Sequence, residues 1–305
     1  MKQIRAAETR QAVGRKAWVP YAFLVPYCTL AAIFFLYPLV NAVGLAFYET
    51  NGPRSRIFVG LENFRYLAND DLFYSALINT TVFACVSVLV QLPLSMGLAL
   101  LLNSGLSKSK GFFRLILFSP NLVGQIFVGI LFSVLFTARY GLVNRGFQAV
   151  LGWGLKQQWL DDPSMAMPGL ILTSLWLWVG FNMIYFLAAL QSVDKTLEEA
   201  ARIDGANAWQ VFFHVTLPSM RHVVVFVLIM SIIGSFQLFE LPLAMFHETH
   251  GLGPENAGIT LITYLNRMAF ELGDLGLGSA VGWIVTLVIM GVSLIQLSVT
   301  GAAKD

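Results

Sequence analysis

Long stretches without a single charged residue are the feature that most limits what this chain can fold into. A helix needs about 20 largely apolar residues to cross the hydrocarbon of a bilayer, and each of these stretches is longer than that. A further apolar stretch, Val223–Phe246, is interrupted only by Glu240. The charge-free stretches are Ala17–Tyr48, Leu72–Ser107, Leu115–Ala138, Pro163–Val193 and Leu275–Ala303.

The composition agrees with several membrane crossings. Hydrophobic residues make up 57% of the 305 residues, charged residues only 12%, and the mean hydropathy is +0.70. Soluble domains carry about 25% charged residues, so this chain could not cover its surface with charge in water. A soluble enzyme, a disordered chain and a nucleic-acid binder are therefore excluded. Continuous apolarity without period-2 alternation indicates helices rather than barrel strands, so we predict an all-α polytopic protein in a lipid bilayer.

Trimming the polar ends of the apolar stretches gives six predicted transmembrane helices. The expected organisation is a tail at 1–18, a first helix and loop at 19–75, a transmembrane domain at 76–299 and a tail at 300–305. The six helices are expected near residues 19–47, 77–102, 113–137, 168–190, 222–246 and 279–299.

The distribution of Lys and Arg predicts the orientation. An even number of spans places both termini on one side of the membrane. The two tails and the connections on their side hold twelve of the 19 Lys and Arg, and the connections on the other side hold seven. Because short connections rich in Lys and Arg stay in the cytoplasm, both termini are predicted to be cytoplasmic.

One predicted cytoplasmic connection, residues 191–221, carries a pattern of its own. Lys195–Ile203 holds good helix formers with a small apolar face. Asp204–Gly205 is a turn signal, and a second short apolar helix follows through Trp209–Phe213. Pro218 suits the first turn of the next helix, where its missing N–H costs nothing. The connection is therefore predicted to form a helix–turn–helix on the face of the membrane.

This connection resembles the EAA loop of ABC importer permeases. The family pattern is Glu-Ala-Ala, three residues, Gly, nine residues, an aliphatic residue, one residue and Leu-Pro, and every spacing fits. The matching residues are Glu199, Ala200, Ala201, Gly205, Val215, Leu217 and Pro218.

Other segments resemble the carbohydrate-uptake branch of that family, in particular its maltose-transporter F-type and glycerol-phosphate A-type subunits. Two positions depart from the family pattern: Glu240 follows Phe239 where Asp is usual, and Leu252 replaces the first glycine of Gly-Gly-Pro. The resembling segments are Phe58–Phe64, Trp159–Pro163, Asp204–Ala206, Ala269–Phe270, Gly276 and Ser279–Ala280.

The resemblance implies a type I ABC importer permease in a bacterial or archaeal cytoplasmic membrane, a transport subunit and not an enzyme. It implies two ATP-binding subunits, a second permease that is usually a different chain, and an extracytoplasmic binding protein that delivers a carbohydrate. The chain has no Gly-x-x-x-x-Gly-Lys-Ser/Thr motif, so ATP and Mg are expected on the partner ATPase and no cofactor on this chain.

The resemblance also implies roles for individual residues of the EAA loop. Glu199 is expected to contact the ATPase, Ala200 and Ala201 to permit close approach, and Gly205 to permit the turn. The remaining residues expected in the coupling element are Asp204, Leu217 and Pro218.

When this chain is aligned with the maltose-type subunits on the EAA loop, the resemblance implies which of its residues occupy their sugar-contacting positions. The alternative is that these side chains fill contacts between helices, as aromatic and small residues do in any membrane bundle. Leu177, Gly234 and Leu238 also fall near the aligned positions, and the two leucines suggest no chemistry. The residues suited to a sugar pathway are Trp178, Phe181, Ser231, Ser235 and Gln237.

Two other function classes compete with the importer. In an ion-coupled secondary carrier, Glu240 would be the proton relay, although its distance from His222 along the helix indicates the membrane boundary. The second alternative is a membrane-embedded enzyme, but the sequence shows no cluster of nucleophilic or metal-ligating residues that would support it. His247 and His250 are spaced i, i+3 but have no third ligand, so no metal site is expected.

Overall fold

The computed structural model describes residues 19–52, 55–104, 109–138, 141–151 and 157–300. The basic tail at 1–18 and the last residues at 301–305 lie outside the described residues. The predicted cytoplasmic location of both termini therefore stays a prediction.

The described chain is helical apart from one short hairpin. The first half consists of α2 (Val19–Ala31), η1 (Ala32–Leu36), α3 (Tyr37–Leu45), β1 (Tyr48–Thr50), β2 (Arg56–Phe58), α4 (Glu62–Leu67), α5 (Asp71–Asn103), α6 (Lys110–Leu122), α7 (Gln125–Leu135) and α8 (Leu142–Leu151). The second half consists of α9 (Pro163–Ser192), α10 (Lys195–Ile203), α11 (Ala208–Val211), η2 (Phe212–Thr216), α12 (Leu217–Ser219), α13 (Arg221–Phe236), α14 (Glu240–Met245), η3 (His247–Thr249), η4 (Pro254–Asn256), α15 (Leu261–Asn266), η5 (Arg267–Glu271) and α16 (Leu275–Thr300).

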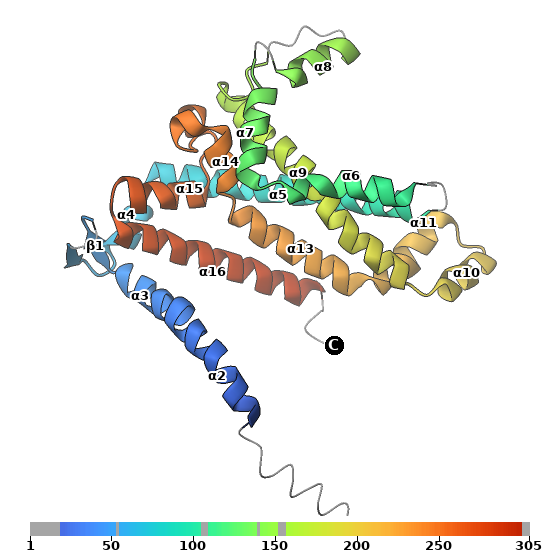
Figure 1. Cartoon of the computed structure of the whole chain (residues 1–305), viewed down its shortest axis with the longest axis horizontal. Coiled ribbons are helices and arrows are strands. Elements are labelled where there is room, and N and C mark those ends of the chain that lie inside the picture. Colours follow the sequence, from blue (N-terminus) through green and yellow to red (C-terminus); the bar gives the residue numbers. More distant parts are fainter. Residues whose placement is uncertain (1–18, 53–54, 105–108, 139–140, 152–156, 301–305) are drawn as a thin grey trace, which may run out of the picture.

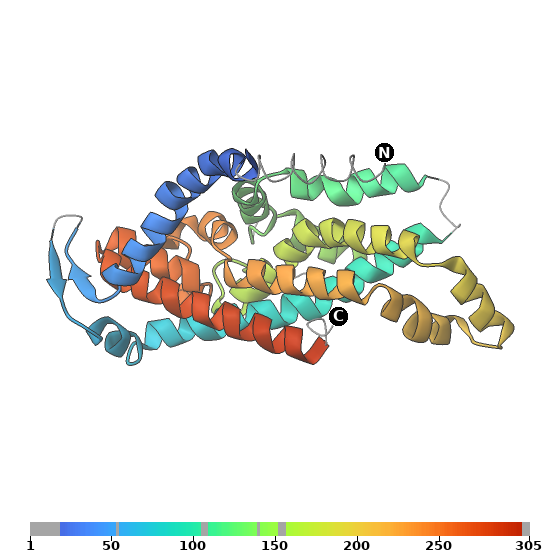
Figure 2. The same ribbon diagram turned by 90° about the horizontal axis from the view of Figure 1, so that it is seen from below.

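The helices α5, α9, α13 and α16 run side by side along the long axis of the molecule (Figures 1 and 2). Two of them begin at aspartate caps. The Asp70 carboxylate accepts the N–H of Leu72 at 3.0 Å, and the Asp162 carboxylate accepts the N–H of Ser164 at 2.9 Å. Such caps satisfy backbone N–H groups at a helix start, which explains why α5 and α9 begin where they do.

Four helices of the described chain are long and apolar enough to cross a membrane, and two bent helix pairs raise the number to six if each pair is one span. The first pair, α6 and α7, bends by 97° across Val123 and Gly124. The second pair, α11–α12 and α13, bends by 75°. The segment predicted as a helix near 113–137 therefore consists of two helices, because the chain turns sharply near its middle.

The predicted helix at 222–246 is also interrupted. α13 ends at Phe236, and α14 starts only at Glu240, so Gln237–Phe239 forms a break. α14 packs against α7, which means that the segments following the two breaks meet each other. The polar backbone groups at such breaks are tolerated within a membrane protein only where neighbouring segments cover them.

The two ends of the bundle differ in structure. At one end, called the hairpin end here, the β1–β2 hairpin is held to the start of α16: the Asp274 carboxylate accepts the N–H and the hydroxyl of Thr50, each at 3.2 Å, and the N–H of Leu277 at 3.0 Å. At the other end, called the α10 end, α10 and α11 extend beyond the long helices (Figure 1). The first helix, α2–α3, projects away from the bundle.

Candidate functional site

The α10 end carries the predicted helix–turn–helix, and its local structure is confirmed. α10 spans Lys195–Ile203, and Gly205 has φ +89°, a left-handed conformation that favours glycine. Asp194 caps α10 by accepting the N–H and the hydroxyl of Thr196, at 2.9 and 2.8 Å. These two hydrogen bonds hold the pKa of Asp194 below its ordinary value.

The second half of this element starts with a reciprocal cap. The Asn207 side chain accepts the N–H of Gln210 at 3.0 Å, and the Gln210 side chain accepts the N–H of Asn207 at 2.8 Å. The Trp209 and Phe213 rings then stack with their centroids 5.9 Å apart. The turn and both caps therefore fix the orientation of α10 relative to α11.

Large apolar side chains of this element are exposed at the α10 end. Ile203 is 85% exposed and Trp209 71% exposed, and Leu197 and Phe213 are also exposed. Glu199 is also exposed on α10, four residues before Ile203 and therefore on the same face of the helix. We call Leu197, Glu199, Ile203, Trp209 and Phe213 the α10 surface. Exposed apolar groups gathered with a carboxylate on a segment beyond the long helices mark a surface for a protein partner.

The other predicted coupling residues lie in the same element. Ala200, Asp204, Gly205 and Pro218 are exposed, whereas Ala201 and Leu217 are half-buried. The structure therefore brings all seven predicted residues to one end of the molecule, and their contact with an ATPase stays a prediction.

The predicted pathway residues gather on α9 and α13. The rings of Trp178 and Phe181 meet edge to face at 5.5 Å. On α13, the Ser235 hydroxyl donates to the Ser231 carbonyl at 2.8 Å. The Asn182 amide donates to the Ser231 hydroxyl at 3.2 Å, so this bond joins the two helices. Leu177 and Leu238, which suggested no chemistry, are buried in the core.

Gln237 lies where α13 ends, and its exposed side chain belongs to the break before α14. The predicted polar pathway residues therefore extend from the middle of α13 to its broken end. Discontinuous helices frequently form substrate sites in transporters, because the freed backbone groups there can bind polar ligands.

Sequence reasoning missed three aromatic residues beside this group. Phe181 stacks on Phe118 of α6 at 6.3 Å and meets Tyr185 at 5.2 Å, and Tyr185 meets Phe226 of α13 at 5.8 Å. Together with Trp178 they form an aromatic cluster across three helices. The spacing of Trp178, Phe181 and Tyr185 at i, i+3 and i+7 on one helix was the available signal.

α6 lies against α9 at Gly180, between Trp178 and Phe181. A Cβ atom at Gly180 would lie 1.7 Å from the backbone oxygen of Leu117. Only glycine permits this approach, and the approach brings Phe118 onto Phe181.

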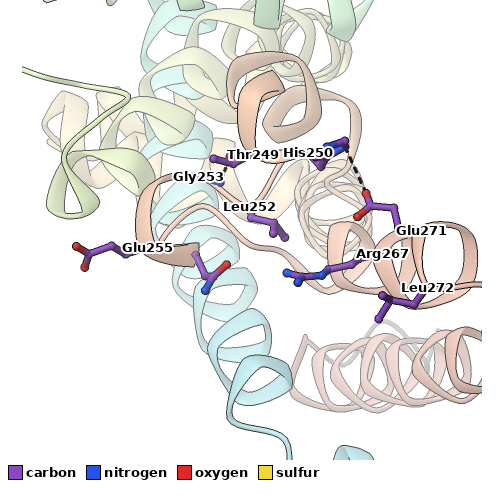
Figure 3. Close-up of a pocket in the computed structure, with 9 residues that line it drawn as sticks. Thr249, His250, Leu252, Gly253, Glu255, Arg267, Glu271 and Leu272 are labelled. Carbon is purple, nitrogen blue, oxygen red and sulfur yellow. Dashed lines mark hydrogen bonds and ion pairs between the residues drawn. The ribbon is translucent and has the colours of Figure 1, made fainter.

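A pocket of about 420 Å³ opens beside the 247–258 loop at the hairpin end (Figure 3). The His250 ring lies 3.7 Å from the Glu271 carboxylate, and the Arg267 side chain lies at the same pocket. His250, Glu255 and Asn256 have φ between 49° and 64°, which is uncommon for residues other than glycine. Strained loops of this kind persist at functional sites, so this pocket is a second candidate contact surface.

Comparison with known proteins places the chain in one family. The family described as "Binding-protein-dependent transport system inner membrane component" matches residues 80–302. The arabinooligosaccharides transport system permease protein AraP of Bacillus subtilis is 37% identical over 289 residues, covering 95% of this chain and 90% of that protein. The lactose transport system permease protein LacF of Rhizobium radiobacter is 33% identical, covering 90% and 92%. The sn-glycerol-3-phosphate permease protein UgpA of Yersinia pestis is 32% identical, covering 92% and 93%.

The fold is also that of a solved importer. A chain of a bacterial ABC transporter involved in the import of the acidic polysaccharide alginate has a TM-score of 0.81 at 23% identity, covering 98% of this chain and 100% of that chain. The resemblance in the EAA loop and the other segments is thereby confirmed at the level of the family. The chain belongs to the inner-membrane components of binding-protein-dependent transport systems, and it is an ABC transporter permease, a transport subunit and not an enzyme.

Proposed function

We propose that this chain forms half of the translocation pathway of an ATP-driven carbohydrate importer and couples to a separate ATPase through residues 191–221. The observation that carries the proposal is the α10 surface, where the exposed carboxylate Glu199 shares a face of α10 with Ile203, which is 85% exposed. Exposure of the Leu197 and Ile203 side chains to water beyond the long helices is unfavourable in free energy. A groove on a partner protein would bury both side chains.

α13 offers a mechanical connection from this surface to the candidate pathway. It starts at Arg221, next to the end of the coupling element, and continues to Phe236. Sixteen residues of helix measure about 24 Å at 1.5 Å per residue. Ser231, Ser235 and Gln237 lie toward its far end, so a displacement of η2 and α12 would be carried to them by a stiff helix.

A carbohydrate fits the side chains of the candidate pathway. Hydroxyl and amide groups of Ser231, Asn182 and Gln237 can exchange hydrogen bonds with sugar hydroxyls, and the rings of Trp178 and Phe181 can cover the apolar face of a sugar. The relatives are named for arabinooligosaccharides, lactose and sn-glycerol 3-phosphate, which supports the same substrate class.

The remaining partners follow from the same proposal. Two ATP-binding subunits would bind ATP and Mg and contact the permease pair from the cytoplasm, and a second permease would complete the pathway. A loaded binding protein would approach the hairpin end, where the strained 247–258 loop and its pocket lie. The membrane would be a bacterial or archaeal cytoplasmic membrane, crossed six times with both termini inside.

The test is purification of the tagged chain from its native membranes in mild detergent, followed by measurement of ATP hydrolysis with candidate sugars and binding protein. We expect a second permease and an ATPase to co-purify, and hydrolysis to rise with loaded binding protein. Glu199→Arg should abolish uptake and ATPase retention at normal membrane levels, whereas Glu49→Arg on the hairpin should retain the ATPase. A chain that purifies alone, with uptake driven by an ion gradient and not by ATP, would refute the proposal.

A further inference from the structure

A hydrogen bond closes the coupling element between residues distant in sequence. The Thr216 hydroxyl donates to the Glu198 carboxylate at 2.8 Å, across a separation of 18 residues. Thr216 is only 5% exposed, and Glu198 is half-buried. Hydrogen bonds to a carboxylate are stronger than those between neutral groups, and this one is partly shielded from water.

The bond adds a direct link between α10 and η2 to the connection that runs through the turn. α10 packs against α11 and η2, and the connection to α11 passes through Gly205. Within the described residues, Glu198–Thr216 is the one hydrogen bond between side chains of α10 and η2. Without it, α10 could pivot about the glycine turn and leave η2 in place.

Thr216 occupies a position where a displacement would be passed on directly. It is the last residue of η2, a π-type turn, and it precedes Leu217 and Pro218 of α12. α13 then starts at Arg221 after the bend. π-type turns are wider than α-helical turns and occur frequently at functional sites. A pull on the Thr216 side chain would therefore act on an adaptable segment at the base of α13.

We propose that Glu198 is a positioning residue that fastens α10 to the base of α13 through Thr216, so that a displacement of α10 also displaces α13. Its role differs from that of Glu199, the adjacent exposed carboxylate on the α10 surface. The inference rests on the proposed coupling of this element to an ATPase.

The experiment compares variants in the complete transporter, reconstituted with its ATPase, second permease and loaded binding protein. The measured quantity is the number of ATP molecules hydrolysed per sugar taken up. Glu198→Ala removes the acceptor, and Thr216→Val removes the donor at nearly unchanged shape. Glu198→Gln keeps an acceptor oxygen, and Thr216→Ser keeps the hydroxyl. Thr196→Val is the matched control, because its hydroxyl bonds Asp194 within the cap of α10 and does not reach η2.

Glu198→Ala and Thr216→Val are expected to raise the ATP cost per sugar about fivefold, the effect of losing one typical hydrogen bond, at normal ATPase retention. Thr216→Ser and Thr196→Val should stay within about twofold of the wild type, since both leave the bond in place. Glu198→Gln should raise the ATP cost less than Glu198→Ala, because it keeps an oxygen acceptor but loses the charge. The double variant Glu198→Ala/Thr216→Val should be no worse than either single variant, because both remove the same bond.

An unchanged ratio in both single variants would overturn the inference, as would additive losses in the double variant. Loss of the ATPase in proportion to uptake would also overturn it, because Glu198 would then contact the ATPase and not η2. The proposed function fails separately, when the wild-type complex shows no ATPase or no ATP-driven uptake.

Discussion

The close approach of α6 and α9 allows a quantitative test at Gly180. In Gly180→Ala, the new Cβ would lie 1.7 Å from the Leu117 oxygen and 2.4 Å from the Leu117 carbonyl carbon. Close C–H···O contacts in proteins have C···O distances of about 3.3–3.6 Å, so the helices must separate by roughly 1.6 Å or more. The atoms in the way belong to the backbone, and no side-chain rotation can relieve the clash.

The expected cost follows from two opposing effects. Overpacking typically costs about 1–3 kcal/mol, and replacing glycine by alanine in a helix interior returns up to about 1 kcal/mol. Because the clash involves the backbone of a whole helix, we expect the upper part of the range and a net destabilisation of about 1–2 kcal/mol. Separation of α6 from α9 would also pull Phe118 away from Phe181, whose centroids are 6.3 Å apart, and should lower transport.

The assay is thermal denaturation of the purified complex in detergent, with uptake measured in parallel. For domains of comparable size, each kcal/mol lowers Tm by roughly 2–4 °C, which is measurable. Gly97→Ala on α5 is the matched control, because its Cβ would meet no atom within 4 Å and should not lower Tm. A Gly180→Ala variant that melts at or above Gly97→Ala and transports normally would refute the packing argument.

Three further predictions use other contacts. Asn182→Ala should lower the unfolding free energy by about 1–3 kcal/mol, seen as a lower Tm, because it leaves the Ser231 hydroxyl without its partner on α9; an unchanged Tm would contradict this. Trp178→Ala should raise the KM for sugar uptake more than Trp178→Phe, and equal KM values would remove this ring from the pathway. The lowered pKa of Asp194 stabilises α10 at any pH above the ordinary value of 3.8, and this stabilisation is lost as the pH falls through the lowered pKa. Pepsin should therefore cleave within residues 195–203 faster as the pH falls below about 4. In Asp194→Asn the cleavage rate should depend less on pH, because the carboxylate that titrates is absent.

The coupling element could be predicted from the sequence because its signals are local. The expected helix Lys195–Ile203 agrees with α10 in both bounds, since an aspartate cap precedes it and Asp204–Gly205 ends it. The apolar stretches likewise predicted α5, α9 and α16 to within several residues. α5 and α9 start earlier than expected, at Asp71 and Pro163, because the predicted spans came from trimmed stretches, whereas the helices begin at aspartate caps just outside those stretches.

The hairpin end was not predicted, because its contacts join distant parts of the chain. Asp274 and Thr50 are separated by 224 residues, and nothing in either local sequence indicates their pairing. The Tyr264 hydroxyl likewise donates to Asp70, 194 residues away. Burial and the neighbouring carboxylate both raise the pKa of Tyr264. The sequence predicted loops at this end but not how they are fastened.

The breaks in the two bent segments show why apolar length alone is an incomplete guide. α2 and α5 continue through Pro26 and Pro93, whereas α6 ends two residues after Pro120. Proline therefore does not by itself decide where a span turns. α6 turns at Gly124, where α7 leaves to pack against α14, and α14 can do this only because α13 ends at Phe236. Each break thus depends on the other, and α13 is left as a stiff segment between the bend at its start and the break at its end. The length and apolarity of the stretches do not reveal this arrangement. It is what would let a movement near Thr216 reach Gln237.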